Sequence, residues 1–384
     1  MFIYSPRRPN GLVVVTDARS RYDMLCSQRH GHTHVLEGWP LGGVLGAEWR
    51  NTTRIALFEY GHKPLKATKG SISEAQREAS KWRQWLAANK PKCVVILPTP
   101  TAGQGEKGQE NSGTVCWTAL GAPDGVGEMR GAFWLRDGTY YVPLFPWAKR
   151  IKELQRWASG RWLQWAAGIA KGHLQPVTCD LMSSTPDEGT CRLLDLMAGR
   201  PIAIDLETIP NQDKVTAIGV SDGIHSVSIP MDRFLPFGRE DFEPGIKDFQ
   251  LCAEITHRLR NLFTANTLKL YHNMKADAPL LEARGFVLNG PTEDTYPAHA
   301  IAFPELRHGL QHAVASLMPA PPWKSLYKPE GLKGITRDDP EYWTCDPEKL
   351  RVYNAEDAFF TVKLAELVLP AVGIPWASHM NSPT

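Results

Sequence analysis

Two pairs of polar side chains, set at different spacings, most constrain how this chain can fold. Asp205 and Glu207 lie two residues apart in an apolar run (Ile-Ala-Ile-Asp-Leu-Glu) that predicts a β-strand, so both carboxylates point to one face of a sheet. Tyr353 and Asp357 lie four residues apart in a segment that predicts a long helix over 348–367, so they share one helical face. A fold that brings this strand and this helix together gathers a phenol and three carboxylates in one place.

A further acid extends this pattern. Asp277 ends the run His-Asn-Met-Lys-Ala-Asp and lies near the start of a helix that we expect after a strand at 267–272. Several carboxylate oxygens in one site suit Mg²⁺ or Mn²⁺, whereas zinc prefers nitrogen and sulfur. Two such cations roughly 3.5–4 Å apart cleave phosphodiesters by in-line attack. The pattern predicts a two-metal nuclease site with four acidic ligands and a tyrosine: Asp205, Glu207, Asp277, Tyr353 and Asp357.

Each part of this pattern also occurs for structural reasons. An Asp-x-Glu pair is common at a solvated strand edge, and Tyr353 with Asp357 is an ordinary helix pair. Asn273 followed by Asp277 is typical of a helix N-cap with an acid in the first turn. The combination, on a strand, a helix and a second helix in that order, is what favours a functional site.

The length of the chain predicts two domains. A chain of 384 residues exceeds the ~150 residues of one domain, and ten of its thirteen tryptophans lie before residue 170. Residues 174–189 mix Pro, Ser, Thr and Gly without clear periodicity. We therefore expect a first domain over 1–174, a linker over 175–190 and a second domain over 191–384.

Both domains have α/β patterns. In the first, strands are predicted at 12–15, 54–60, 93–97 and 140–144, with helices at 74–88 and 148–171, which favours a parallel sheet. In the last of these helices we expect Trp157 and Trp165 to be buried and Trp162 to be exposed. Lys149 and Arg150 would supply a basic, nucleic-acid-binding side. In the second domain, three antiparallel strands at 201–206, 215–220 and 225–230 precede helix 249–263, strand 267–272 and two further helices, which predicts a mixed sheet.

Composition excludes several other classes of protein. The net charge of +2 shows no global basicity, so any nucleic-acid surface is local. The seven cysteines contain no Cys-x-x-Cys pair, which argues for reduced thiols and a cytoplasmic setting. No run approaches ~18 apolar residues and the N-terminus lacks the order of a signal peptide, so we expect no membrane partner.

The C-terminal half resembles the DnaQ-like (DEDD) 3′–5′ exonucleases of the tyrosine subgroup, above all the proofreading domains of bacteriophage family A DNA polymerases. Matching segments lie at 280–286, 293–300, 304–310, 323–324 and 353–358, and the likeness covers about 190–370. The resemblance implies a ribonuclease H-like mixed sheet. It also assigns roles: Asp205, Glu207 and Asp357 hold one metal, Asp205 and Asp277 serve the second, and Tyr353 orients the attacking water. The same resemblance implies nucleic-acid contacts by Thr208 and Asn273, and Leu206 is a further candidate for such a contact. We expect His308, beside Gly309, to position a loop or to touch DNA rather than to bind metal.

The resemblance also implies a function and a partner. We expect a metal-dependent 3′–5′ exonuclease that uses two Mg²⁺ or Mn²⁺ ions on single-stranded or frayed 3′ ends of DNA. No polymerase segment follows within the 384 residues, so we expect a free-standing exonuclease or a proofreading subunit with a separately encoded DNA polymerase, in the host cytoplasm if a bacteriophage encodes the chain. Two alternatives stay open: an RNA-trimming enzyme of the same subgroup, which would need contacts to the 2′-OH, and a non-catalytic DNA-binding or polymerase accessory module. Unneutralised carboxylates repel one another, which counts against the second alternative.

The N-terminal half resembles the uracil-DNA glycosylase superfamily in the order of its strands and helices. Where active members carry a Gly-Glu-x-Pro-Gly-type loop, this chain has Thr16-Asp-Ala-Arg-Ser20. Where they carry His-Pro-Ser, it has Phe145-Pro-Trp147. The resemblance therefore implies a glycosylase-like domain that no longer excises bases and instead holds DNA or docks a partner.

Overall fold

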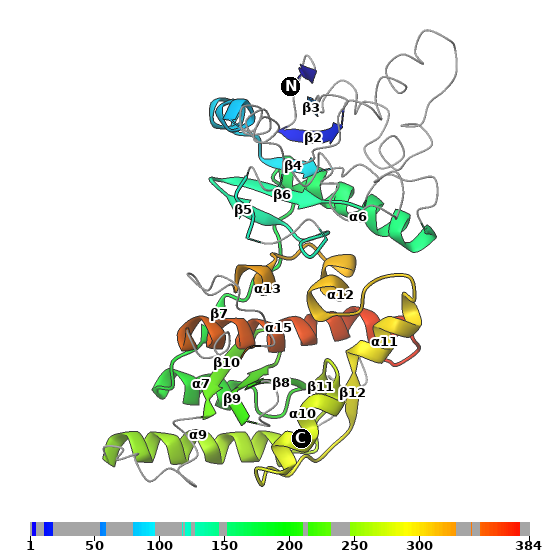
Figure 1. The fold of residues 1–384 in the computed structure, drawn as a ribbon. Helices are drawn as coiled ribbons and strands as arrows, with labels where there is room; N and C mark the ends of the chain where they lie inside the picture. Colours follow the sequence, from blue (N-terminus) through cyan, green and yellow to red (C-terminus); the bar gives the residue numbers. More distant parts are fainter. Residues whose placement is uncertain are drawn as a thin grey trace. The chain divides into compact units, whose positions relative to one another are not determined.

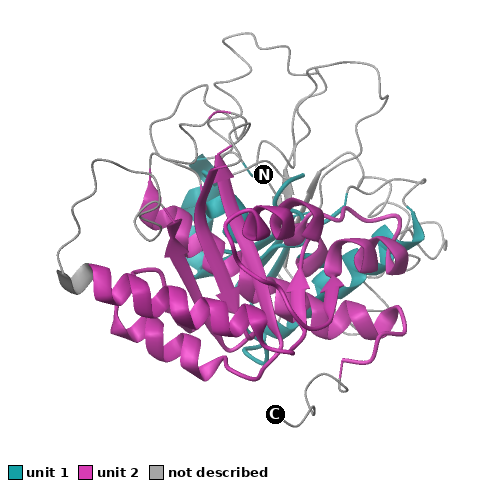
Figure 2. Ribbon diagram, turned by 90° about the horizontal axis from the view of Figure 1, so that it is seen from below, with its two compact units in different colours: residues 1–177, 315–326 teal, residues 178–314, 327–384 magenta. Residues whose placement is uncertain are grey.

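A computed structural model describes residues 2–4, 11–17, 54–58, 80–96, 117, 120–123, 127–145, 152–209, 214–231, 246–327, 339 and 346–376. The chain divides into two compact units, of which the first contains residues 1–177 and 315–326 and the second contains residues 178–314 and 327–384 (Figure 2). The sequence did not indicate that 315–326 belongs with the N-terminal residues. The division into a glycosylase-like and an exonuclease domain, as a division of function, stays a prediction.

The first unit is built on a six-stranded sheet whose inner strands are parallel. Its order is β1-β3-β2-β4-β6-β5, with the two edge strands antiparallel to their neighbours. The strands are β1 (Phe2–Tyr4), β2 (Leu12–Asp17), β3 (Arg54–Phe58), β4 (Cys93–Ile96), β5 (Trp134–Arg136) and β6 (Thr139–Pro143). This confirms the predicted parallel α/β layer, whereas the likeness to glycosylases stays a prediction.

Two helical segments pack on this sheet. Residues 80–89 are helical, and the start of the predicted helix 74–88 lies outside the described residues. Trp82 is fully buried and stacks on Trp85 with ring centroids 5.4 Å apart, in a core shared with Val94 and Ile96. Helix α6 (Glu153–Ala170) packs against β2 and β4.

The tryptophans of α6 correct the predicted helical face. Trp162, expected to be exposed, is 3% exposed, whereas Trp157 is 36% exposed. The reason lies in another segment: Gly131 adopts a φ of +79° and approaches so closely that a Cβ there would overlap the Trp162 indole. The Trp162 Nε1 donates a hydrogen bond to the carbonyl of Ala315 at 2.5 Å. Helical spacing cannot reveal a pocket that a distant glycine creates.

The segment 315–326 is held in the first unit by backbone hydrogen bonds. The amide of Phe133 donates to the carbonyl of Ala320, and the amide of Val177 to the carbonyl of Pro319, both at 2.8 Å. The guanidinium of Arg161 adds a bond of 3.0 Å to the carbonyl of Leu317. This segment contains the end of α12 (Leu310–Leu317) and all of α13 (Trp323–Leu326). It is therefore an integral part of the first unit.

The second unit has a mixed six-stranded sheet of order β12-β11-β8-β9-β10-β7. Strands β8, β9 and β10 form an antiparallel meander, β11 and β12 continue parallel to β8, and β7 is parallel to β10. The strands are β7 (Leu181–Ser183), β8 (Ile202–Ile209), β9 (Lys214–Ser221), β10 (His225–Pro230), β11 (Lys269–Tyr271) and β12 (Thr292–Asp294). This confirms the mixed sheet that was predicted for the second domain. Strand β7 lies within residues 175–190, which the composition predicted as a linker.

Helices cover both faces of this sheet (Figure 1). Helices α7 (Glu188–Leu196) and α9 (Ile246–Thr264) share a hydrophobic core with Ile202, Ile204 and Leu206 of β8. Helix α15 (Pro347–Ala371) packs on β8, β9 and β10, and Asp346 caps it by accepting the amide of Lys349 at 3.0 Å. The shorter helices α10 (Met274–Glu282) and α11 (Thr295–Ala302) follow β11 and β12. Among the described residues, no helix has both the length and the apolar character needed to cross a bilayer.

Candidate metal and nucleic-acid site

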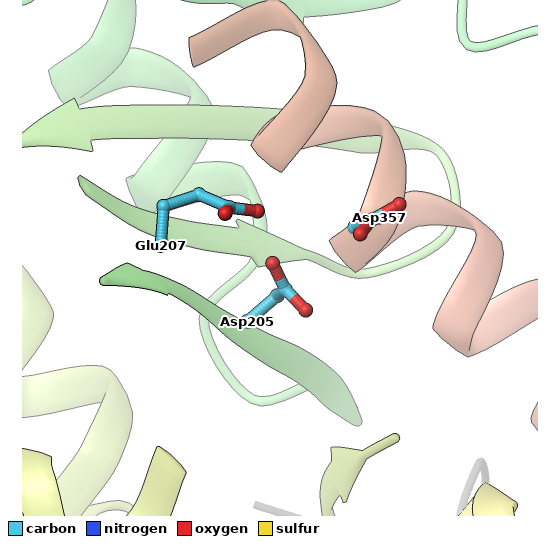
Figure 3. A group of neighbouring side chains, drawn as sticks. All are labelled: Asp205, Glu207 and Asp357. Carbon is cyan, nitrogen blue, oxygen red and sulfur yellow. The ribbon is translucent and has the colours of Figure 1, made fainter. Parts of the chain in front are cut away.

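Three of the predicted acids converge between β8 and α15. One carboxylate oxygen each from Asp205, Glu207 and Asp357 lies within 4.8 Å of the others (Figure 3). Glu207 and Asp357 are 6% and 2% exposed, and Asp205 is half-buried. Negative charges this close repel one another when buried, and a divalent cation with oxygen ligands offsets that repulsion. The donor set therefore fits Mg²⁺ or Mn²⁺.

Strand β8 points these acids to the α15 side because side chains alternate along a strand. Leu206, between them, is 8% exposed and belongs to the opposite hydrophobic core, so its contact with nucleic acid stays a prediction. The register of β8 with β9 shifts between Glu207 and Thr208, where the Thr216 hydroxyl donates to the Glu207 carbonyl at 3.0 Å. Such irregularities re-aim side chains next to active sites. Thr208 is half-buried at this point, and its proposed nucleotide contact is untested.

Tyr353 lies one turn before Asp357 on α15, as the spacing predicted. It is 6% exposed, and its ring stacks on that of Tyr327 with centroids 4.9 Å apart and 27° between the planes. The stack restricts rotation of the Tyr353 ring, so the position of its hydroxyl is fixed by a residue that the sequence pattern did not single out. No signal in the sequence placed Tyr327 there.

One further α15 residue at the site was missed by the sequence analysis. Asn354 is fully buried and its side-chain amide donates to Oδ2 of Asp205 at 2.8 Å. Its position three residues before Asp357 could have indicated a shared helical face. Glu356 is half-buried, and burial, with the charge of Asp357 as a second cause, raises the pKa of its carboxyl group to about 7.

Asp277 is placed separately from the three clustered acids. It lies on α10, is 8% exposed, and is not among the acids whose oxygens meet within 4.8 Å. Its carboxylate lies near the Tyr271 hydroxyl: burial raises the pKa of Tyr271, and the negative charge of Asp277 raises it further. The position in the first helical turn favours the charged carboxylate. Its role as a second-metal ligand stays a prediction.

Asn273 has an unusual backbone beside the site. Its φ is +81°, in the left-handed region, and its exposed side chain makes no capping bond although it precedes α10. The capping is done by Asp294, whose two carboxylate oxygens accept the amides of Asn273 and Met274 at 2.9 and 2.8 Å. Oδ1 of Asp294 also accepts the Tyr296 amide at 2.9 Å and so joins α10 to α11. Asparagine adopts left-handed backbone more readily than most residues, so the Asp294 bonds hold Asn273 in a conformation that suits its side chain.

Three histidines fix the loop that carries His308. The His308 carbonyl accepts a bond from Nε2 of His272 at 2.9 Å, and Nδ1 of His308 lies 3.0 Å from Nδ1 of His299. Burial lowers the pKa of His299 to about 3, with His308 and His272 contributing, so its ring is neutral at pH 7. His308 thus helps to position this loop, while its contact with nucleic acid stays a prediction. Lys149 and Arg150 lie outside the described residues.

No known protein family matches this chain, and no curated protein matches it. Solved structures are similar to about half of it. Escherichia coli RNase D is 16% identical over 50% of this chain and 45% of that chain, with a TM-score of 0.32. Brucella melitensis NrnC with bound Mg²⁺ is 17% identical over 53% of this chain and 87% of that chain, with a TM-score of 0.33. Exonuclease X in complex with 5′ overhanging duplex DNA is 14% identical over 47% and 96%, with a TM-score of 0.24.

Proposed function

We propose that this chain is a metal-dependent 3′–5′ exonuclease that hydrolyses the terminal phosphodiester of single-stranded or frayed DNA ends. The observation that carries the proposal is the convergence of Asp205, Glu207 and Asp357 within 4.8 Å, with Tyr353 one turn away on the same helix as Asp357. Three carboxylates this close repel one another, and a bound divalent cation would offset that repulsion. In a hydrolytic site these carboxylates would bind the metal ions that assist cleavage of the phosphodiester.

The proposed metal ligands follow from the donor set. Asp205, Glu207 and Asp357 would hold one Mg²⁺ or Mn²⁺, and Asp205 together with Asp277 would serve a second. When bound, two such ions stabilise the charge that develops on the attacking and leaving oxygens of the phosphodiester. Among these ligand assignments, that of Asp277 rests most on sequence resemblance, because Asp277 lies on α10 and is not one of the three clustered acids.

The other site residues would bind and orient the reactants. The Tyr353 hydroxyl would hydrogen-bond the attacking water, and the stack with Tyr327 keeps that hydroxyl in one place. Asn273 would contact the terminal nucleotide through its exposed side chain, supported by the Asp294 bonds that hold its backbone in the left-handed conformation. Thr208 and His308 would make the remaining nucleotide contacts.

The first unit and the partner are proposed from sequence resemblance. The first unit would be a glycosylase-like platform that holds DNA without excising bases, and a separately encoded DNA polymerase would supply the ends to be trimmed in the cytoplasm. Incubation with uracil-containing DNA in EDTA tests the first point. Intact DNA is the expected result, and abasic sites would contradict it.

A substrate panel tests the proposed reaction. The substrates are 5′-labelled single-stranded DNA, a duplex with a mismatched 3′ end, single-stranded RNA, and circular single-stranded DNA as a control without ends. With Mg²⁺ or Mn²⁺ we expect stepwise shortening of the linear DNAs from the 3′ end, and no reaction in EDTA. Faster shortening of RNA would favour the exoribonuclease alternative. Cleavage of the circle would instead indicate an endonuclease.

A further inference from the structure

Asn354 spans three adjacent strands of the second unit. Its Nδ2 donates to Oδ2 and to the backbone carbonyl of Asp205 at 2.8 and 3.2 Å, and its Oδ1 accepts the Ser228 hydroxyl at 2.7 Å. Asp205 and Ser228 are both register partners of Gly219, from β8 and β10 on either side of β9. The asparagine amide therefore lies over the central strand and bonds to both outer strands.

Gly219 makes this arrangement possible. A Cβ at Gly219 would lie 2.6 Å from the Asn354 carbonyl oxygen and 2.9 Å from its Oδ1, closer than real Cβ contacts allow. Only a residue without a side chain lets α15 approach the sheet closely enough for the amide to reach both neighbours. The orientation of the amide is set by chemistry, because a carboxylate and a carbonyl can only accept, so the NH₂ group must face Asp205.

We propose that Asn354 is a positioning residue for the metal site, which holds the Asp205 carboxylate toward Glu207 and Asp357. This inference rests on the metal-dependent reaction proposed above. Asn354 is fully buried, so its bonds to Asp205 and Ser228 are shielded from competing water. Groups that hydrogen-bond to a metal-ligating carboxylate typically change metal affinity or activity by 10–100-fold when they are removed.

The chain offers a matched control on the same strand. The Ser226 hydroxyl donates to the carbonyl of Ala355 at 2.6 Å, so Ser226 and Ser228 both join β10 to α15, and both are buried. Of these two serines, Ser228 is the one whose hydroxyl bonds to the Asn354 side-chain amide. Ser226→Ala therefore removes a comparable strand-to-helix bond without touching the support of Asp205.

The test is titration of Mn²⁺ into the metal-free full-length protein by calorimetry. For Asn354→Ala we expect Mn²⁺ affinity to fall roughly 10–100-fold. Its activity should recover at saturating Mn²⁺, with KM for DNA unchanged. Ser228→Ala should lower the affinity in the same direction, and Ser226→Ala should match the parent protein.

Equal Mn²⁺ affinity of folded Asn354→Ala and the parent would overturn the positioning role and leave the proposed reaction untouched. If Asn354→Ala does not fold, the two serine variants decide, and equal affinities of Ser228→Ala and Ser226→Ala would overturn the inference. A parent protein that binds no Mn²⁺ would contradict the metal site itself, and with it both proposals.

Discussion

The ring of Tyr327 lies 4.9 Å from the ring of Tyr353, centroid to centroid, with the two planes 27° apart. Both side chains are buried, at 3% and 6% exposure. Tyr327 is also the first residue of the second unit after the segment 315–326, which belongs to the first unit. Tyr327, which directly follows the segment 315–326, thus restricts the ring of Tyr353, the proposed water-orienting tyrosine.

Replacing Tyr327 by leucine should slow the reaction with little effect on substrate affinity. Stacked aromatic pairs contribute about 0.5–1.5 kcal/mol beyond their buried area, so loss of the stack should lower kcat by up to roughly tenfold. Tyr327→Phe keeps the ring and serves as the control. Steady-state kinetics on single-stranded DNA measures the difference, and an unchanged kcat in a folded Tyr327→Leu would contradict this role.

Gly131→Ala should destabilise the first unit more than an ordinary glycine substitution. Alanine at position 131 would be strained by the left-handed φ of +79°. Its Cβ would also overlap the buried Trp162 indole. Gly138 has nearly the same φ, +77°, but nothing within 4 Å, which makes Gly138→Ala the matched control. We expect roughly 2–5 kcal/mol for Gly131→Ala and roughly 1–2 kcal/mol for the control. Urea unfolding followed by tryptophan fluorescence gives both values, and equal losses would refute the overlap.

The stability of the protein should fall as pH decreases from 7 to 5, with His299 contributing. Burial lowers the pKa of His299 in the folded protein to about 3, below its ordinary value of 6.5. Between pH 6.5 and pH 3 the unfolded chain therefore binds a proton that the folded protein does not. As pH falls through this range, the free energy of unfolding decreases. The expected contribution is about 2 kcal/mol between pH 7 and pH 5. His299→Gln should remove it, whereas His257→Gln, at an exposed position of α9, should not. Parallel pH slopes for the parent and His299→Gln would show that this histidine is not the source.

Metal should stabilise the parent protein through the acidic cluster. In EDTA, Asp357→Asn relieves repulsion among three clustered carboxylates, so this variant should be at least as stable as the parent. With Mg²⁺ at about 100 times its dissociation constant, the parent should gain about 2.7 kcal/mol and the variant much less. Thermal unfolding with and without Mg²⁺ measures both effects, and an equal gain in both proteins would place the ion elsewhere.

Local spacing in the sequence predicted the parts of the site that depend on one element at a time. Asp205 and Glu207 share a strand face and Tyr353 and Asp357 share a helix face, because the periods of strand and helix dictate it. Long-range geometry was not predictable. Asn354 reaches Asp205 only because Gly219, on a different strand, has no side chain.

Two other features depended on distant segments in the same way. Residues 181–183 were assigned to a linker by composition, but they pair with β10 as an edge strand. Asp294 joins α10 to α11 through backbone amides that are about twenty residues apart in the sequence, so no local motif revealed it. Composition and periodicity describe segments one at a time, whereas these contacts arise only when the segments meet.

The most direct test of the account is the product ladder from 5′-labelled single-stranded DNA with Mg²⁺, compared among the parent, Asp205→Asn and Asp357→Asn. The parent protein should give a ladder of products shortened one nucleotide at a time from the 3′ end. Loss of about 4 kcal/mol of transition-state stabilisation should slow either variant by roughly 10³-fold. Glu188→Gln, at an acid whose side chain is 89% exposed, should match the parent. A ladder from Asp205→Asn or Asp357→Asn as fast as that of the parent would contradict the proposed active site.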